Sequence, residues 1–576
     1  MTDDFDALLS DGLPLPSRTA APGGSVTVPA APSGDMAMGA FEGADRLDSQ
    51  ISLWAPPIQS VDADIIPAKR TIDARSRDMM RNDAFVQGGG NLHKDNIVGA
   101  HYLLNARPAS KTIFGTQDDQ WEEEFQEEVE EKWELYSDSP DCWVDAARMN
   151  NFTAHIRMAT GVHLMAGEML ATVEWLPQDF GPYNTAIQMV ELDRLCTRQD
   201  APSSMMDPNV RAGVRFNDRG APIAYQIRSE QVSDYGPRAF KRASWKEIDI
   251  RKPWGRMQVI HLFETLRPEQ TRGVTEMAAA LKAMKITHTW RDINVQHALT
   301  QALYAAAITS DLPSEQVFAQ LGGGQATPDA VSAAVTNYAE GYLSSIASYV
   351  GNARGLQIDG VKIPHLFPGT KLELLSPGKG GPLGTEFEQS LLRYIASAMG
   401  VSYEQLSRDY TNTNYSSARA AMTETWKFMQ ARKKLIADRF ATIIYRLWLE
   451  EAINAGKIET AKGVSIYDAP RPGQRYGRLN TAFDALSRCE WIGASRGQID
   501  EGKETQAAVM RITNGLSTAE DELARLGKDW RKVYRQLKRE AEMRKALKLV
   551  FMPSELAAQQ AELTASDNSS NQDEAA

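Results

Sequence analysis

The sequence has only three cysteines in 576 residues, Cys142, Cys196 and Cys489. Their wide, unpaired spacing excludes a disulfide scaffold and a cysteine-rich zinc site, and it suits a reducing cytoplasm. No run approaches the ~18 to 20 apolar residues that a membrane helix needs. The acidic start MTDDFDALLS also lacks the basic and apolar regions of a secretory signal. We therefore expect no membrane partner.

The motifs of common catalytic sites are missing too. There is no G-x-x-x-x-G-K-[ST] phosphate loop, no G-x-S-x-G nucleophile elbow and no H-E-x-x-H zinc motif. The eight histidines are dispersed, and the run PGKGGPLGTE lacks both the Lys-Ser/Thr ending and the G-x-G-x-x-G spacing. Glu404 and Asp409 beside Tyr410 and Tyr415 suggest acid–base chemistry no more than a polar loop. We predict no cofactor, no metal site and no catalytic residue, which favours a scaffold, a binder or a machine part over an enzyme.

Positive charge is in deficit. The chain has 63 Lys and Arg residues against 75 Asp and Glu residues, a net charge of −12. Because affinity for duplex DNA comes largely from neutralising phosphates, this balance argues against tight nucleic-acid binding. An acidic surface around a hole would instead let nucleic acid pass without sticking. Composition alone does not separate that role from an ordinary acidic enzyme.

The hydrophobic pattern changes along the chain and predicts an α+β protein. Residues 1–35 are rich in Ala, Pro, Gly and Ser, which is typical of a flexible arm. A helix is predicted over 70–86, and short β-type runs follow between 169 and 263. Residues 217–220, Asn-Asp-Arg-Gly, predict a hairpin turn between two of these runs.

The second half of the chain is mainly helical. Two long stretches without Gly or Pro have apolar residues at helical spacing. They predict helices over 275–310 and 416–454, each roughly 50 Å or more in length. A β-type piece lies between them, and a shorter helix over 385–400 ends at Gly400, a plausible C-terminal cap.

Two helical segments carry opposite charge. The acidic segment DDQWEEEFQEEVEEKWELYSDS repeats Trp121, Phe125, Val129 and Trp133 every four residues. It is either a solvated amphipathic helix or a negative face for a basic partner or passing DNA. Residues 528–548 have nine basic and three acidic side chains and are the one electrostatic candidate for nucleic acid. Alternatively, these Lys and Arg side chains snorkel over a core stripe, or both interpretations hold; the stripe would be Trp530, Tyr534, Leu537, Ala541 and Leu549.

Three strings, in order, resemble the lambda-type portal proteins of tailed bacteriophages. Residues 74–104 contain an Arg-rich helix, the pair Arg81-Asn82 and an Asn-x-Val-Gly turn at 96–99. Residues 259–281 contain an Arg-x-x-Gln-x-Arg-Gly string formed by Arg267, Gln270, Arg272 and Gly273. The most distinctive string ends the third stretch, 387–421, and is formed by Asp409, Asn414, Tyr415, Ser416, Ser417 and Arg419. The resemblance covers about 36–480, and the regions outside it match poorly.

The resemblance implies a ring, typically of twelve copies, at one vertex of the capsid. A separate terminase motor drives DNA through its channel, and the ring later anchors the neck and tail. The implied α+β portal fold has a mixed α/β wing, long stem helices, a small α/β clip and a helical crown. The expected regions are 1–35 flexible N-terminal arm, 36–274 N-terminal part of the wing, 275–310 stem helix, 311–376 clip, 377–403 returning stem helix, 404–415 tunnel loop, 416–480 wing helix, 481–560 helical crown and 561–576 disordered tail.

The tunnel loop and the crown supply the candidate site residues. In the loop, Asn, Thr and Tyr would form weak, sequence-blind hydrogen bonds with phosphates while Arg408 and Asp409 largely cancel; the residues are Arg408, Asp409, Tyr410, Asn412, Asn414 and Tyr415. A simpler interpretation is that Asn414 or Ser416 merely caps the next helix. The crown residues expected to face packaged DNA are Arg531, Lys532, Arg535, Lys538 and Arg539.

The resemblance also implies partners and a location. The partners are other copies of the chain, the terminase large subunit, the major capsid and scaffolding proteins, head-completion or adaptor proteins, and double-stranded DNA in the channel. The location is the portal vertex of the virion, reached by assembly in the host cytoplasm. Two other functions stay open, a neck or adaptor ring and an unrecognised enzyme acting on capsid or DNA. Adaptors are usually shorter, and a cluster of buried carboxylates or a metal would favour the enzyme.

Overall fold

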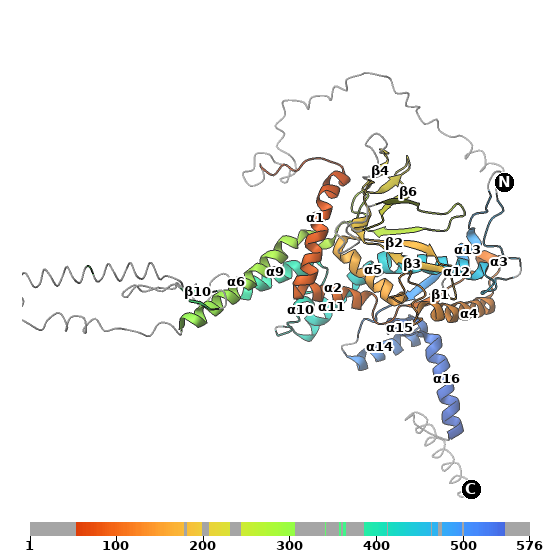
Figure 1. Ribbon diagram of the computed structural model, residues 1–576. Coiled ribbons are helices and arrows are strands. Elements are labelled where there is room, and N and C mark those ends of the chain that lie inside the picture. The colour runs from red at the N-terminus through yellow and green to blue at the C-terminus, as the bar shows by residue number, and fades with distance from the viewer. Residues whose placement is uncertain are drawn as a thin grey trace, which may run out of the picture. The chain divides into compact units, whose positions relative to one another are not determined.

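A computed structural model describes most of the chain between residues 53 and 547 (Figure 1). The described residues are 53–177, 181–198, 207–230, 244–305, 340, 356–358, 361–363, 385–411, 413–461, 463–470, 475–497 and 500–547. The chain separates into residues 1–59 and 60–576, and every described helix and strand belongs to the second part. The predicted arm at 1–35, most of the clip at 311–376 and the tail at 561–576 lie outside the described residues. The described elements are mixed helices and small sheets, so the predicted α+β class is confirmed.

Two consecutive helices open the second part, α1 (Val61–Asn82) and α2 (Ala84–Ile97). The prediction of one helix over 70–86 was wrong at Asp83, which has extended backbone angles. The Asp83 carboxylate accepts hydrogen bonds from the backbone N–H groups of Phe85 and Val86, both at 3.0 Å. An aspartate that caps a new helix in this way ends the preceding one.

The central sheet is antiparallel, with strand order β3-β2-β8. These strands are β2 (Glu168–Trp175), β3 (Thr185–Met189) and β8 (Val259–Phe263). A second antiparallel sheet has the order β4-β5-β6-β7, with β4 (Val210–Arg211), β5 (Val214–Phe216), β6 (Pro222–Arg228) and β7 (Trp245–Asp249). Asn217 accepts from the N–H groups of Arg219 and Ala221 between β5 and β6, which confirms the predicted hairpin turn.

An aromatic core joins helices to the sheet. Helix α4 (Asp119–Ser137), α5 (Phe152–Ala166), α12 (Asp438–Asn454) and β11 (Cys489–Ile492) all contribute to it. The Trp133 ring lies 5.0 Å from Phe152 and 5.2 Å from Trp448, in edge-on arrangements that aromatic pairs favour. Phe125, Val129 and Trp133 are buried, so the predicted apolar face of the acidic helix is confirmed.

Two helices lie in the segments predicted to be the stem helix and the returning stem helix. After a 3-10 turn, η5 (Glu276–Ala279), α6 spans Leu281–Ala305 and lies beside α9 (Thr385–Ala398) (Figure 1). Arg291 of α6 donates to Glu388 of α9 at 2.6 Å. The helix predicted over 416–454 is present as α11 (Tyr415–Arg432) and α12, joined by the π-helical turn η6 (Lys433–Ala437).

The remaining elements are short or C-terminal. β1 (Leu103–Ala106) pairs with β11, and β9 (Leu356–Ile358) pairs with β10 (Val361–Ile363). The other short elements are α3 (Ser110–Phe114), η2 (Leu192–Arg194), α10 (Tyr403–Ser407) and α13 (Thr481–Leu486). The C-terminal helices are α14 (Glu501–Thr513), α15 (Ala519–Arg525) and α16 (Trp530–Leu547).

Candidate functional site: the loop before α11 and the helix α16

A buried carboxylate organises the segment that leads into α6. Glu168, the first residue of β2, is fully buried. Its Oε1 accepts from Arg272 Nη2 at 2.6 Å and lies 3.3 Å from Lys69 Nζ. Its Oε2 accepts from the Gly273 N–H at 2.8 Å and lies 3.0 Å from His261 Nε2. Both oxygens are therefore occupied by protein donors.

Charges in this cluster are balanced by neighbours. Burial alone would raise the pKa of the Glu168 carboxyl, but Arg272, the hydrogen bond from His261 and Lys69 hold that pKa well below its usual range. Burial lowers the pKa of His261, so a neutral ring whose Nε2–H donates to Glu168 fits near pH 7. Nη1 of Arg272 donates to the carbonyl oxygens of Leu195 and Ala212, at 2.9 and 3.2 Å.

The motif from Arg267 to Gly273 lies between β8 and α6. We call this segment, together with the Glu168 cluster that it contacts, the joint. Gln270 accepts from the Leu266 N–H and donates to the Arg272 carbonyl, which shapes the turn. A Cβ added at Gly273 would lie 2.2 Å from the Gly167 carbonyl oxygen, so only glycine fits there. Gly167 itself has a φ of +76° between α5 and β2.

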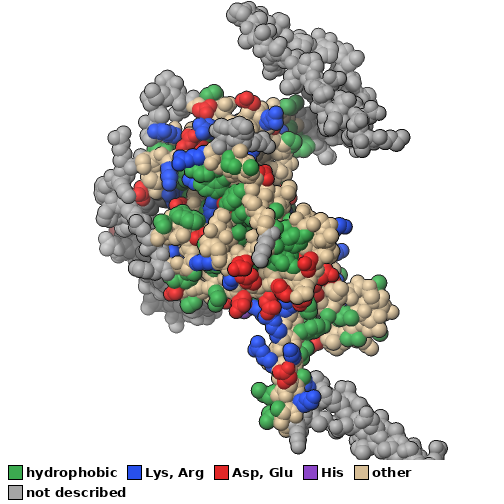
Figure 2. Space-filling view, turned by 90° about the vertical axis from the view of Figure 1, so that its right-hand side faces the viewer, with side chains coloured by type: hydrophobic (Ala, Val, Ile, Leu, Met, Phe, Trp, Pro, Cys, Tyr) green, Lys and Arg blue, Asp and Glu red, His purple; other side chains and the backbone are tan. Residues whose placement is uncertain are grey.

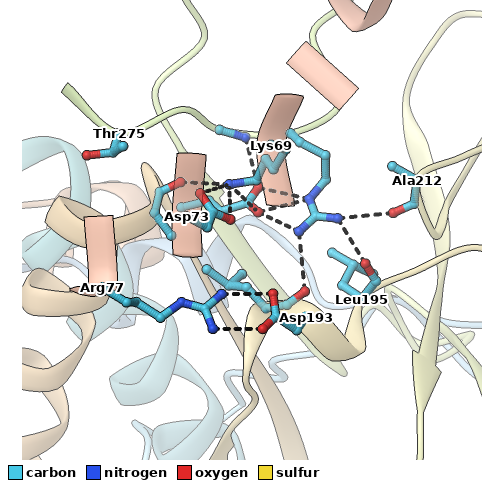
Figure 3. A network of polar contacts seen from close by, with 12 residues as sticks. Lys69, Asp73, Arg77, Asp193, Leu195, Ala212 and Thr275 are labelled. Carbon is cyan, nitrogen blue, oxygen red and sulfur yellow. Dashed lines mark hydrogen bonds and ion pairs between the residues drawn. The ribbon is translucent and has the colours of Figure 1, made fainter. Parts of the chain in front are cut away.

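Helix α1 closes the joint from the other side. The Asp62 carboxylate accepts from the Thr271 N–H at 3.0 Å and from its hydroxyl at 2.6 Å. Arg77 forms a two-pronged ion pair with Asp193 at 2.7 and 2.8 Å (Figure 3). Sequence reasoning gave Arg272 only as part of a family string and assigned no role to Arg77. The available signal for this cluster was Glu168, a charged residue between apolar ones in the string AGEMLATV.

The π-helical turn η6 directly follows α11, the helix that begins at the end of the candidate loop. Arg432, at the end of α11, pairs with Glu264 and Glu276, which flank the Arg267 motif. Lys433 donates to Asp438 and to the Trp491 carbonyl, each at 2.8 Å. π-helical turns carry one extra residue per turn and are frequent at functional sites. Here the turn lets adjacent cations reach two different parts of the chain.

The segment 404–415 is partly helical. Its first residues belong to α10, which Ser402 and Gln405 cap reciprocally. Arg408 ends α10 with a φ of +57°, and the rest is a tight turn. Asn414 Oδ1 accepts from the Ser417 N–H at 2.9 Å, so the predicted capping role is confirmed at Asn414, while Ser416 donates to it.

At the tip of this segment the Asp409 side chain is hydrogen-bonded, whereas the Tyr410 side chain is exposed. The Asp409 carboxylate accepts from the Thr411 N–H and hydroxyl, and that hydroxyl bond lowers the pKa of Asp409. Tyr410 between them is 53% exposed. No ion pair joins Arg408 to Asp409 in the described part of the chain. Asn412 lies outside the described residues, and of Tyr415 the structure describes the backbone only.

The basic helix α16 meets the acidic helix α4. Arg531 donates to Gln126 at 2.8 Å, Lys532 pairs with Glu134 at 2.6 Å, and Arg535 pairs with Glu127 at 2.6 Å. Figure 2 shows acidic side chains gathered next to basic ones where α16 begins. The basic partner proposed for the acidic helix is thus present in the same chain.

The core-stripe interpretation of α16 was wrong for the described residues. No residue of α16 is buried, and Tyr534 and Leu537 are 47% and 46% exposed. Leu549 lies outside the described residues. The sequence pattern correctly predicted a helix with one apolar face, but the described residues do not cover that face. Lys538 and Arg539 are also exposed on α16.

Nothing in the described ranges resembles a metal centre or a membrane span. No three His, Cys, Asp or Glu side chains there gather in a way that could hold a metal ion. Among the described helices, none is both long enough and apolar enough to cross a bilayer. The buried carboxylates of Glu168 and Asp73 lie with Lys69 and Arg272, so they form a structural ion cluster.

Three portal proteins align with most of the length of this chain. Portal protein B of Escherichia phage lambda and the portal protein of Escherichia phage N15 are each 34% identical to it over 505 residues. These alignments cover 88% of this chain and 89% and 90% of the relatives. A probable portal protein of Halomonas phage phiHAP-1 is 22% identical over 488 residues, 84% of this chain and 83% of that protein.

A solved structure and a family description complete the comparison. A chain from the neck of an empty gene transfer agent particle aligns with 82% of this chain and 95% of its own length, at 14% identity and a TM-score of 0.37. Residues 48–433 match the family described as phage portal protein, lambda family. With that match and the 34% identity to two portal proteins, this chain belongs to the lambda family of phage portal proteins.

Proposed function

We propose that copies of this chain close into a ring, of twelve subunits, at the unique vertex of a phage capsid. The ring is the channel through which double-stranded DNA enters during packaging and leaves during ejection. Family membership over residues 48–433 is the observation that carries this proposal. The net charge of −12 is consistent with a wall that does not retain DNA, because like charges repel within the ~8 to 10 Å Debye length.

The ring serves different partners in turn. During assembly in the host cytoplasm, the major capsid and scaffolding proteins surround it, and the terminase large subunit docks on it to drive DNA inward. Head-completion or adaptor proteins then replace the terminase and connect the neck and tail. This chain needs no catalytic group for these steps. In support, the donors around Glu168 leave neither of its oxygens for a substrate.

The segment 404–415 is the tunnel loop in this proposal. Two helix caps hold its ends, at Ser402 before α10 and at Asn414 before α11. The base is fixed as well, because His93 Nε2 lies 2.8 Å from the Met399 carbonyl oxygen and the His93 ring packs edge-on against Phe428 of α11. A rigid base with an exposed tyrosine at its tip suits brief polar contacts with passing phosphates.

Electron microscopy of the purified chain tests the ring. We expect annular particles with a central hole, and a protein that stays monomeric at every concentration would contradict the proposal.

A packaging assay tests the loop separately. Tyr410→Ala should lower the amount of packaged DNA while rings form normally. Tyr476→Ala is the matched control, since Tyr476 is similarly exposed at 47% but lies against Trp254, away from the loop. If both variants package like the wild type, the loop has no role and the ring proposal stands.

A further inference from the structure

Helix α16 carries an apolar face that the described part of the chain leaves largely exposed. This face, the α16 stripe, consists of Trp530, Val533, Tyr534, Leu537 and Ala541, which recur at helical spacing. The residues that contact α4 are Arg531, Lys532 and Arg535. At about 3.6 residues per turn, Lys532 and Arg535 lie on the opposite side of the helix, while Arg531 lies at the edge of the stripe, over the Trp530 ring. The ion pairs with α4 therefore turn the α16 stripe away from the helix that anchors it.

Trp530 is the half-buried end of the α16 stripe, with the Arg531 guanidinium 4.9 Å from its ring. Its indole N–H is shielded from solvent, yet it has no hydrogen-bond partner among the described residues. The edge-on contact with Tyr534 fixes the Trp530 ring but supplies no acceptor for its N–H.

A second uncovered apolar surface lies on and just after α14. This α14 surface consists of Val509, Met510, Ile512 and Leu516, which are 56%, 56%, 41% and 78% exposed. Arg511, between them, is turned toward α15, where it forms a two-pronged ion pair with Glu522 at 2.8 Å. No residue of α14 is buried. A polar contact again fixes the helix and leaves its apolar residues without cover.

We propose that the α16 stripe of one subunit packs against the α14 surface of the neighbouring copy. This proposal rests on the ring function proposed above. A ring needs a heterologous interface, in which one surface of a subunit meets a different surface of the next. Two unlike apolar surfaces on one chain, each held outward by internal ion pairs, meet that requirement.

Charge is complementary across the proposed contact. In the first turn of α14, Glu501 lies on the side of the helix that carries Ile512. The second half of α16 carries Lys538 and Lys545, which flank the α16 stripe on one side. Opposite charges beside an apolar contact set its register and disfavour wrong pairings. Two α16 stripes facing each other would instead bring like charges together.

Cysteine cross-linking of the full chain tests the contact. The probe is a short bismaleimide, applied to assembled rings of the double variant Val509→Cys plus Leu537→Cys. If the stripe of each copy meets the next copy's α14 surface, denaturing gels should show a ladder of covalent multimers. The single variants and the wild-type chain, whose native cysteines are Cys142, Cys196 and Cys489, should not form this ladder. The matched control is Val509→Cys plus Arg539→Cys, because Arg539 lies on the side of α16 opposite the stripe.

Each outcome decides the proposal. A ladder in the double variant and none in the control supports it. Cross-linked monomers would mean that the stripe folds back on its own α14 surface. Rings without cross-links would mean that another partner or the C-terminal segment covers it. An equal ladder in the control would mean non-specific contact; these last three outcomes overturn the proposal. Absence of rings from the wild-type chain would instead overturn the ring function.

A charged substitution supplies a second readout. Leu537→Asp should raise the subunit concentration needed for half-assembly about tenfold or more, because it places a carboxylate in an apolar contact. Arg539→Asp should leave that concentration near the wild-type value, and equal effects of the two substitutions would count against the interface. Circular dichroism of both variants checks that the subunits are folded.

Discussion

Two Arg–Glu ion pairs with the same length occupy opposite environments in this molecule. Arg272 and Glu168 lie 2.6 Å apart with side chains 7% and 0% exposed, whereas Arg535 and Glu127, also 2.6 Å apart, are 49% and 53% exposed. Breaking a buried pair leaves an uncompensated charge in a poorly solvated site. Breaking an exposed pair returns both groups to water. The first pair therefore holds the fold, while the second holds α16 reversibly.

The largest effect should come from the buried pair. Arg272→Leu leaves the Glu168 carboxylate without its main partner, and we expect the free energy of unfolding of the unassembled subunit to fall by about 3–5 kcal/mol. Urea denaturation measures this change. Arg267→Leu, in the same motif, is the control, because its pair with Asp64 is about half exposed. Its loss should stay below about 1 kcal/mol, and similar losses in the two variants would refute the contrast.

Backbone packing at the same joint should come next. Gly273→Ala places a Cβ 2.2 Å from a backbone oxygen that cannot rotate away. We expect a loss of up to about 3 kcal/mol in the free energy of unfolding. Gly88→Ala is the matched control, since nothing lies within 4 Å of the added Cβ in α2. It should stabilise the subunit by up to about 1 kcal/mol through helix propensity; a neutral Gly273→Ala would mean that the joint is looser than described.

As the pH falls, protonation of buried histidines should lower the free energy of unfolding before protonation of Glu168 does. Burial lowers the pKa of His93 and of His163 to about 4, from 6.5. Below 6.5 the unfolded chain thus binds protons that the folded chain rejects, so stability falls as the pH drops. At pH 5 each histidine accounts for about 2 kcal/mol of this loss. The pKa of Glu168 is instead depressed, so its contribution persists until the pH falls below about 4.5.

Urea unfolding at several pH values between 7.5 and 5 measures this dependence. His163→Gln should flatten the decline, whereas His101→Gln, at an exposed position, should retain the wild-type profile. An unchanged slope in His163→Gln would show that this ring takes up a proton in the folded subunit.

The smallest effect should come from the exposed pairs. Lys532→Gln plus Arg535→Gln should change the free energy of unfolding by under about 1 kcal/mol. Hydrogen exchange in α16 should nevertheless rise in the variant. Raising salt to about 1 M should produce a similar rise in the wild type, because the Debye length falls to about 3 Å. Lys538→Gln, beyond the α4 contacts, should not change exchange, and a salt-independent wild type would show that another contact holds α16.

Sequence reasoning predicted the elements better than their connections. The helix over 416–454 followed from periodicity, because local apolar spacing determines one helix face. The break at Asp83 was missed, since a capping aspartate and an exposed helical aspartate look alike without backbone angles.

Pairing across long sequence distances explains the other misses. Glu168 and Arg272 are separated by 104 residues, so no local pattern joins them. The acidic and basic helices were each recognised by charge, but their mutual contact depends on the packing of elements about 400 residues apart. At the candidate loop, the Asn414 cap could be predicted from a known helix-start preference. The Arg267 motif could be recognised only as a family marker, because its role depends on α1 and β2.

The π-helical turn η6 sets the rotation of α11 about the helix axis relative to α12. One surplus residue in a helix rotates the upstream part by about 100° relative to the downstream part. Deleting a single residue within Lys433–Ala437 would leave an unbroken rod, yet it would swing the tip at Tyr410 around the axis and pull Arg432 away from Glu264 and Glu276. The extra residue of η6 therefore determines both the direction of the loop tip and the ion pairs of Arg432.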